Sequence, residues 1–254
     1  MVAETSRKAT GHVAAAIRKR LEPSPFHLAD GKTLRPALTS LLRAFTNLDP
    51  APQRPKAITP KLLRAMYRLS GAGSRRTHDT AQAAAAELGI VGFFFAMRSC
   101  EYTTTRNPGK TKVLDIGHIT FRDARKRVLP QDCDLLAAEY VTLTFVDQKN
   151  GHKMDSRTQQ KTGDRVLCPV RQLHSLLECI LCTLPATPDT TINTIHIARS
   201  VVRVTGTLLL QQIRSTCHLC GGFKTFGFQP SEIGTHSMRS GGAMALFLND
   251  HPVH

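Results

Sequence analysis

Near its C-terminal end the chain reads Gly234-Thr235-His236-Ser237-Met238-Arg239-Ser240-Gly241-Gly242-Ala243. Thr is a favoured helix N-cap residue, and the Ala, Met and Leu residues that follow are good helix formers, so the stretch predicts a helix capped by Thr235. His236 and Arg239 are three residues apart and would share one face of this helix. An imidazole and a permanently charged guanidinium near the positive end of a helix dipole suit a phosphate oxygen. The stretch therefore predicts a phosphate-binding helix start.

Two upstream segments carry residues that would complement such a site. An apolar helix is predicted to lead directly to Arg98, and Glu101 follows three residues later, so a cation and a carboxylate would lie at the rim of a core. Further on, apolar and Thr residues alternate over Tyr140–Val146, as they do in strands, and an Asn-Gly pair at 150 and 151 signals a tight turn. The pattern predicts a β-hairpin with Lys149 at its tip.

Taken in chain order, Arg98, the hairpin Lys149 and the pair His236 and Arg239 resemble the catalytic half of a tyrosine recombinase (phage-integrase-like) domain. The run Gly-Thr-His-Ser-Met-Arg-Ser-Gly-Gly-Ala is similar to the version found in recombinase-like proteins of eukaryotic mobile elements, as is Asp-Gln-Lys-Asn-Gly. The resemblance covers roughly Thr80 to the C-terminus. It implies an α+β fold that is mainly α-helical with a small β-sheet, and a role in DNA recombination or integration.

The resemblance also implies a role for each residue of the motif. In the family, a tyrosine attacks a phosphodiester and becomes joined to the 3′ phosphate, and two arginines neutralise the charge that builds on the phosphate. Arg98 and Arg239 match those arginines. His236 would hydrogen-bond the same phosphate or assist proton transfer, and Glu101 would hold the arginine or the imidazole in place.

A lysine of the hairpin protonates the leaving 5′ oxygen in this family. We prefer Lys149 for that role because it directly precedes the predicted turn, with Lys153 as the second choice. The chemistry that the resemblance implies requires no metal or other cofactor, because religation uses the energy of the phosphotyrosine bond.

The nucleophile is the residue that the motif does not supply. The chain contains three tyrosines, Tyr67, Tyr102 and Tyr140, and all of them precede the His236 helix, whereas the family's nucleophile follows it. We therefore expect this chain to be a truncated recombinase that binds DNA but does not cleave it alone. The alternative is a non-catalytic DNA-binding protein derived from a mobile-element recombinase.

Composition favours a polyanionic partner inside the cell. The 254 residues carry 34 Lys and Arg against 19 Asp and Glu, a net charge of +15, and such a field attracts phosphates. No apolar run is long enough to span a bilayer, so we expect duplex DNA and no membrane as the partner. The family implies homo-oligomers on DNA. Seven cysteines without secretory features indicate reduced thiols in the nucleus or cytoplasm.

The distribution of charge and of helix-interrupting residues along the chain predicts two domains. Residues 1–72 contain helical patterns at about 12–21, 34–46 and 60–70, with basic faces, and would form a small DNA-gripping domain; the alternative is a solvated basic surface. Residues 73–79 are rich in Gly, Ser and Arg and would form a linker, and residues 80–254 would form the catalytic-type domain. The residues predicted to contact DNA are Arg18, Lys19, Arg20, Arg75 and Arg76.

Other elements follow from local patterns. We predict helices over Ala81–Met97, Val170–Leu184 and Thr205–Leu219, and strands over Val113–Arg122 and Leu135–Val146. The first of these helices is apolar on every side and would be buried, with its three consecutive Phe residues in the core.

One rival site remains open from the sequence. Cys179 and Cys182 form one Cys-x-x-Cys pair, and Cys217 and Cys220 form another, a spacing that is typical of a four-thiolate zinc site. The first pair lies in an apolar helical pattern, where free Cys commonly serves as a small core residue. A zinc-stabilised basic interaction module is therefore the less favoured alternative.

Overall fold

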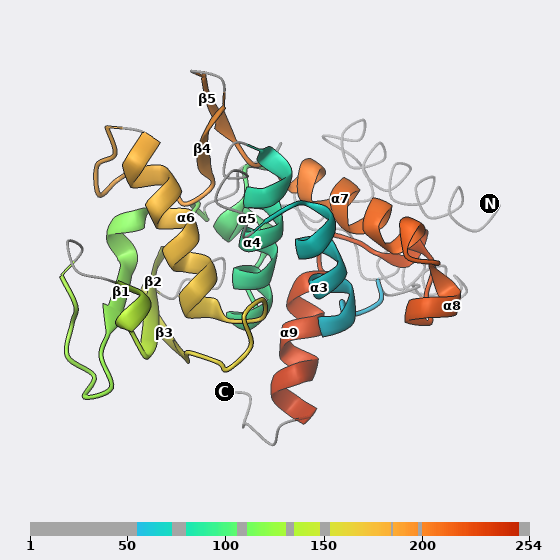
Figure 1. Cartoon of the computed structure of the whole chain (residues 1–254), viewed down its shortest axis with the longest axis horizontal. Coiled ribbons are helices and arrows are strands. Elements are labelled where there is room, and N and C mark those ends of the chain that lie inside the picture. Colours follow the sequence, from blue (N-terminus) through green and yellow to red (C-terminus); the bar gives the residue numbers. More distant parts are fainter. Residues whose placement is uncertain are drawn as a thin grey trace, which may run out of the picture. The chain divides into compact units, whose positions relative to one another are not determined.

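The computed structural model of the chain describes residues 55–72, 80–105, 111–130, 135–147, 153–183, 185–197 and 200–248. The described residues all belong to one compact unit (Figure 1). Its helices pack around one apolar core and a small antiparallel sheet covers one side of it. The predicted fold class, mainly α with a small β-sheet, is confirmed.

Helix α4, Ala81–Phe94, lies at the centre of the unit and contacts α3, α6, α7 and α9 (Figure 1). Thr80 caps it, because its hydroxyl accepts a hydrogen bond from the Ala83 amide. Every residue from Ala83 to Phe93 is buried, which agrees with the apolar pattern on all sides of this helix. Phe93 and Phe95 belong to the core, as predicted.

Helices α3, α6 and α7 surround α4 close to their predicted bounds, at Pro60–Leu69, Pro169–Thr183 and Gly206–Leu219. Thr59 caps α3 and Thr205 caps α7, each through its side-chain oxygen. Because α3 packs on both α4 and α7, it belongs to the same unit as the residues after 80. The division therefore falls before α3, whereas the sequence placed it after, at residue 72.

Strands β1 (Ile119–Arg122), β2 (Tyr140–Asp147) and β3 (Lys153–Gln160) form the three-stranded sheet in that order. All pairs are antiparallel, with Ile119 opposite Leu143 and Leu143 opposite Arg157. The predicted hairpin is confirmed, but β1 and β2 begin later than the strands predicted over Val113–Arg122 and Leu135–Val146. Residues Ile116–His118 and Leu135–Ala137, which we assigned to strands, form 3-10 turns.

A second hairpin, β4 (Thr194–Ile197) and β5 (Ser200–Arg203), was not predicted from the sequence. Both strands have only four residues, too few to produce a readable alternation. Two short helices complete the fold, α5 (Ser99–Tyr102) and α8 (Phe223–Phe226). None of the helices in the described ranges is both long and apolar enough to cross a bilayer.

Helix α9, Ser237–Leu248, packs its glycines against α4 and against the segment before α3. A β-carbon on Gly242 would overlap the carbonyl oxygen of Phe93, and one on Gly241 would overlap the carbonyl oxygen of Ile58. Only glycine allows backbones to approach this closely. The glycine pair therefore fixes where the N-terminal end of α9 lies relative to the C-terminal end of α4.

Candidate phosphate-binding site

The C-terminal end of α4 determines where Arg98 lies. The amide of Met97 donates to the Gly92 carbonyl and the amide of Ala96 donates to the Phe93 carbonyl, a pattern that ends a helix with a left-handed residue. Ala96 is that residue, with φ of 46°. The prediction that the helix extends to Met97 was wrong: it ends at Phe94, because the chain leaves the helix through the left-handed Ala96, two residues before Arg98.

Glu101 fixes Arg98 in place. One carboxylate oxygen of Glu101 accepts from the Arg98 amide at 2.7 Å, and the other lies 3.1 Å from Nη1 of the Arg98 guanidinium. Both side chains are mostly buried, with exposed fractions of 16% for Arg98 and 6% for Glu101. A charge pair this well shielded is stronger than one at the surface, so the guanidinium is held in one orientation.

Helix α9 begins at Ser237, so His236 directly precedes it. The prediction that Thr235 is the N-cap residue was therefore wrong. The Ser237 hydroxyl accepts from the Gly234 amide at 2.9 Å, which turns the chain into the helix. His236 is exposed and Arg239 is partly exposed. Among the residues that the structure describes, no side-chain hydrogen bond or ion pair engages either of them.

The segment that leads to His236 is tied to two other parts of the fold. Arg214 of α7 donates to the Ile233 carbonyl through Nε at 3.0 Å and Nη2 at 2.6 Å. The Ile58 amide donates to the Ser237 carbonyl at 3.0 Å. These bonds hold the start of α9 from both sides. Sequence reasoning missed Arg214, because nothing local marks an arginine in the middle of a helix as a positioning residue.

The β2–β3 hairpin is joined to the same end of α4. Nε2 of Gln159 donates to the Phe94 carbonyl at 2.8 Å, across 65 positions of sequence. Lys149 lies outside the described residues, between the two paired strands. Lys153, the second choice for the general acid, is exposed at the first position of β3.

The three segments singled out from the sequence therefore meet at one turn, Phe93–Ala96. Arg98 follows this turn directly, Gly242 of α9 packs against it, and Gln159 of β3 is hydrogen-bonded to it. Chemically, the arrangement offers two guanidinium groups and one imidazole on neighbouring segments. Such a set can bind a phosphate and stabilise added charge on its oxygens.

No family model matches the chain, and no curated protein matches it either. Among solved structures, the chain is similar to a crystal structure of the XerH site-specific recombinase bound to its difH substrate, a pre-cleavage complex. The TM-score is 0.46, the sequence identity is 14%, and the match covers 86% of this chain and 56% of that one. The chain thus spans little more than half the length of that recombinase.

The three tyrosines lie in different environments. Tyr102 is fully buried, and its ring contacts Gly92 of α4. Burial raises the pKa of the Tyr67 hydroxyl, and the nearby Glu87 raises that pKa further. Tyr140 lies on β2, where its ring lines the open face of the sheet.

The alternative zinc site receives no support from the structure. Cys179 and Cys182 lie on α6, whereas Cys217 lies on α7 and Cys220 directly follows the end of that helix. Cys179 and Cys217 are buried and Cys182 is exposed. Within the described ranges, no three His, Cys, Asp or Glu side chains gather as a metal would require. Cys179 belongs to the core on α6, as the apolar pattern of this helix suggested, whereas Cys182 lies on its exposed side.

Five residues predicted from the sequence to contact DNA lie outside the described residues. They are Arg18, Lys19, Arg20, Arg75 and Arg76.

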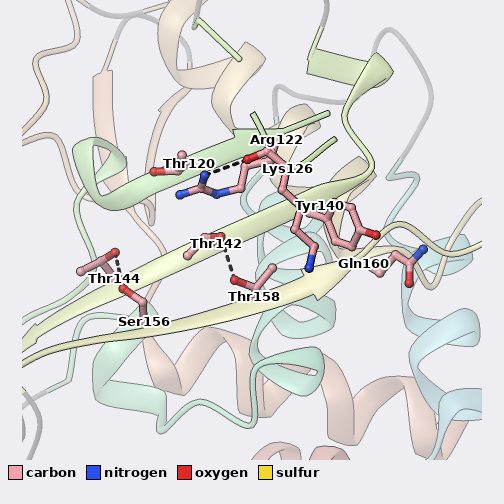
Figure 2. A pocket seen from close by; sticks show the side chains of 9 residues that line it. All are labelled: Thr120, Arg122, Lys126, Tyr140, Thr142, Thr144, Ser156, Thr158 and Gln160. Atoms are coloured by element: carbon pink, nitrogen blue, oxygen red, sulfur yellow. Dashed lines mark hydrogen bonds between the residues drawn. The ribbon is translucent and has the colours of Figure 1, made fainter. Parts of the chain in front are cut away.

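Sequence reasoning also missed a hollow on the open face of the three-stranded sheet, of about 530 Å³ (Figure 2). A signal was present in the sequence, because Tyr140, Thr142 and Thr144 alternate with apolar residues along β2. The lining residues are Thr120, Arg122, Lys126, Tyr140, Thr142, Thr144, Ser156, Thr158 and Gln160.

Proposed function

We propose that this chain is a DNA-binding protein of the tyrosine-recombinase type, which holds a phosphodiester with Arg98, Arg239 and His236. The observation that carries the proposal is the meeting of three segments, far apart in sequence, at the Phe93–Ala96 turn. A family motif that matched by chance would have no reason to assemble around one turn. The proposal includes a nuclear or cytoplasmic location and an origin in a mobile element.

The charges of the site suit an anionic group such as a phosphodiester. Arg98 is already paired with Glu101, so it contributes an oriented but largely compensated charge. Arg239 has no carboxylate partner among the described residues, and the exposed His236 precedes it by three positions. The net positive charge of the site therefore comes mainly from Arg239, which makes Arg239 the residue to test first.

Binding without cleavage is the activity we propose for this 254-residue chain. The reaction of the family needs a tyrosine hydroxyl beside the phosphate. Tyr102 is buried against Gly92, and Tyr140 faces the hollow of the sheet. Tyr67 is half-buried on α3, near Glu87 and Gln172. Loss of the covalent step leaves phosphate binding intact, because binding and attack depend on different residues.

Binding to a random-sequence DNA duplex, measured by fluorescence anisotropy at low salt, tests the proposal. The Arg239→Gln variant should bind more weakly and should show a slope of log affinity against log salt that is shallower by about 0.9, the value for one phosphate contact. The control is Arg171→Gln, which removes an exposed arginine from α6 and changes the net charge by the same amount. Equal affinities and slopes for the two variants would contradict the proposed site.

A strand-cleavage assay tests whether the chain binds DNA without cleaving it. The purified chain is incubated with a nicked or suicide duplex and then denatured, and protein that remains joined to DNA is detected by gel. We expect no covalent adduct. An adduct that survives denaturation would show that the chain cleaves DNA, and it would overturn the non-catalytic reading.

A further inference from the structure

The open face of the three-stranded sheet is a regular polar grid. Antiparallel pairing aligns its side chains in cross-strand rows, with Thr144 beside Ser156 and Thr142 between Thr120 and Thr158. Two of these pairs are hydrogen-bonded through their hydroxyls, Thr142 with Thr158 at 2.9 Å and Thr144 with Ser156 at 3.0 Å (Figure 2). The hydroxyls are therefore held in fixed positions.

The next row carries the charge. Arg122 lies beside Tyr140, which pairs with Gln160, and Lys126 reaches over the Tyr140 ring with its Nζ 6.0 Å from the ring centre (Figure 2). The Arg122 guanidinium donates to the Lys126 carbonyl at 3.0 Å, so the turn that holds one cation also orients the other. Lys126 adopts a left-handed φ of 62° at this turn.

The open face of the sheet is positively charged, because no acidic residue in its lining offsets the cations. Two of the nine lining residues are cations and none is a carboxylate. The nearest acid along the chain, Asp123, is engaged by Arg127 at 2.7 Å and by two backbone amides of the same turn. Asp155 lies at the other register position of β3, opposite Phe145, which faces the core.

An ordinary solvated sheet face is polar, and well-behaved protein surfaces intersperse both signs of charge. Here an oriented guanidinium, an ammonium group, fixed hydroxyls and one aromatic ring line a hollow of about 530 Å³. Guanidinium groups and hydroxyls are common partners of phosphate oxygens, and an aromatic ring offers a stacking surface to a sugar or a base. Their combination suits a sugar-phosphate backbone better than an isolated small anion.

We propose that this sheet face is a second nucleic-acid contact surface, which binds the phosphodiester backbone of a strand through Arg122 and Lys126. The inference rests on the proposed function, since it assigns a further part of the surface to DNA. It concerns residues on the opposite side of the sheet from Gln159, whose side chain is joined to α4. It would extend the contact from the Arg239 site over the outer face of the hairpin.

The test compares two double variants in the same binding assay, with a random-sequence duplex over a range of salt concentrations. Arg122→Gln with Lys126→Asn removes the two cations, and Asn tolerates the left-handed conformation at position 126. Arg203→Gln with Lys224→Asn removes two exposed cations from β5 and α8 and gives the same net charge. Only the first double variant should lower the salt slope by about 0.9 for each lost phosphate contact.

The outcomes distinguish this inference from the proposed function. If the wild-type chain binds DNA and the two double variants have equal salt slopes, the sheet-face contact is overturned and the Arg239 site remains. A chain that does not bind DNA at low salt would overturn both. Circular dichroism of each variant shows whether it is folded, and a reduced slope counts only for a folded protein.

Lysine footprinting gives a second readout that needs no variant. The chain is acetylated briefly with and without the duplex, and each lysine is quantified by mass spectrometry. Lys126 should be protected several-fold by DNA, whereas Lys224 should react equally in both samples. Equal reactivity of Lys126 with and without bound duplex would contradict the inference.

Discussion

At the scale of single residues, Glu87 carries the clearest dependence on pH. It lies in the buried middle of α4, and its carboxyl accepts from the Ser175 hydroxyl at 2.7 Å. Burial raises the pKa of Glu87 from the ordinary 4.5 to about 7, although the bond from Ser175 opposes this shift. The folded protein therefore keeps the Glu87 proton at a pH where the unfolded chain has lost it.

Stability should accordingly fall as the pH rises between about 4.5 and about 7. Below this window both states hold the proton, and above it neither does, so the contribution is full in acid and is lost across the window. The loss is about 3 kcal/mol, from the size of the shift. Urea unfolding of wild type and Glu87→Gln at several pH values measures it, because the difference between the two proteins isolates this group. Parallel stability curves would contradict the assignment.

Gly242 is the second residue with a sharp expectation. Gly242→Ala places a methyl group on the Phe93 carbonyl oxygen, so α9 must move away from α4. We expect a loss of about 1–3 kcal/mol or more, the usual range for overpacking. Gly163→Ala is the matched control, since a β-carbon there meets nothing within 4 Å. The midpoint of thermal unfolding should drop for the first variant only, and a similar small change in both would count against the close contact.

Some local features around the candidate site could be predicted from the sequence and others could not. Arg98, His236 and Arg239 stand in a recognisable order, and Glu101 is adjacent to its partner in the fold. The left-handed conformation of Ala96 has no sequence signal, because glycine is the residue expected at such a position. The sequence pattern therefore predicts a helix that is three residues longer than α4.

At the scale of elements, the β2–β3 hairpin depends on Gln159 for its attachment to α4. Gln159→Ala removes a hydrogen bond and leaves the Phe94 carbonyl without this partner, so we expect a loss of about 1 kcal/mol. Gln160→Ala, on the open face of the same strand, is the control and should leave stability unchanged. Chemical denaturation of the two variants measures the difference, and equal losses would show that the anchor contributes nothing.

Elements with local signals were predicted well and elements held by distant contacts were not. Helices α3 and α7 start after Thr59 and Thr205, whose capping role is encoded within three residues. Strands β4 and β5 have four residues each, and β5 is exposed along its length. Their pairing depends on the surrounding fold rather than on a pattern of their own, so the sequence gives no warning of them.

At the scale of the whole molecule, the net charge of +15 should make DNA binding strongly dependent on salt. Each phosphate neutralised contributes about 0.9 to the slope of log affinity against log salt. We therefore expect a steep linear decline for a random-sequence duplex, and competition by heparin but not by a neutral polysaccharide. Titrations at several salt concentrations provide the slope. Binding that does not change with salt would argue against phosphates as the main partner.

The meeting of the three motif segments at one turn also belongs to this scale, and the sequence does not reveal the contacts that produce it. Arg98, the hairpin and α9 are separated by long stretches of chain, and no local rule brings Gly242 to Phe93 or Gln159 to Phe94. The resemblance predicted which residues belong together. The physical means, a pair of glycines and one amide hydrogen bond, appear only once the chain is folded.

The contact between Gly242 and α4 has a consequence for how this protein can change over evolutionary time. Arg239 is partly exposed and its replacement leaves the core intact, whereas Gly242 is confined by the backbone of α4. In a lineage released from the proposed phosphate binding, Arg239 would drift freely while Gly242 stayed. Related genes in which both residues persist would indicate continued selection for phosphate binding. Genes that keep only the glycine would indicate that the fold is retained without phosphate binding.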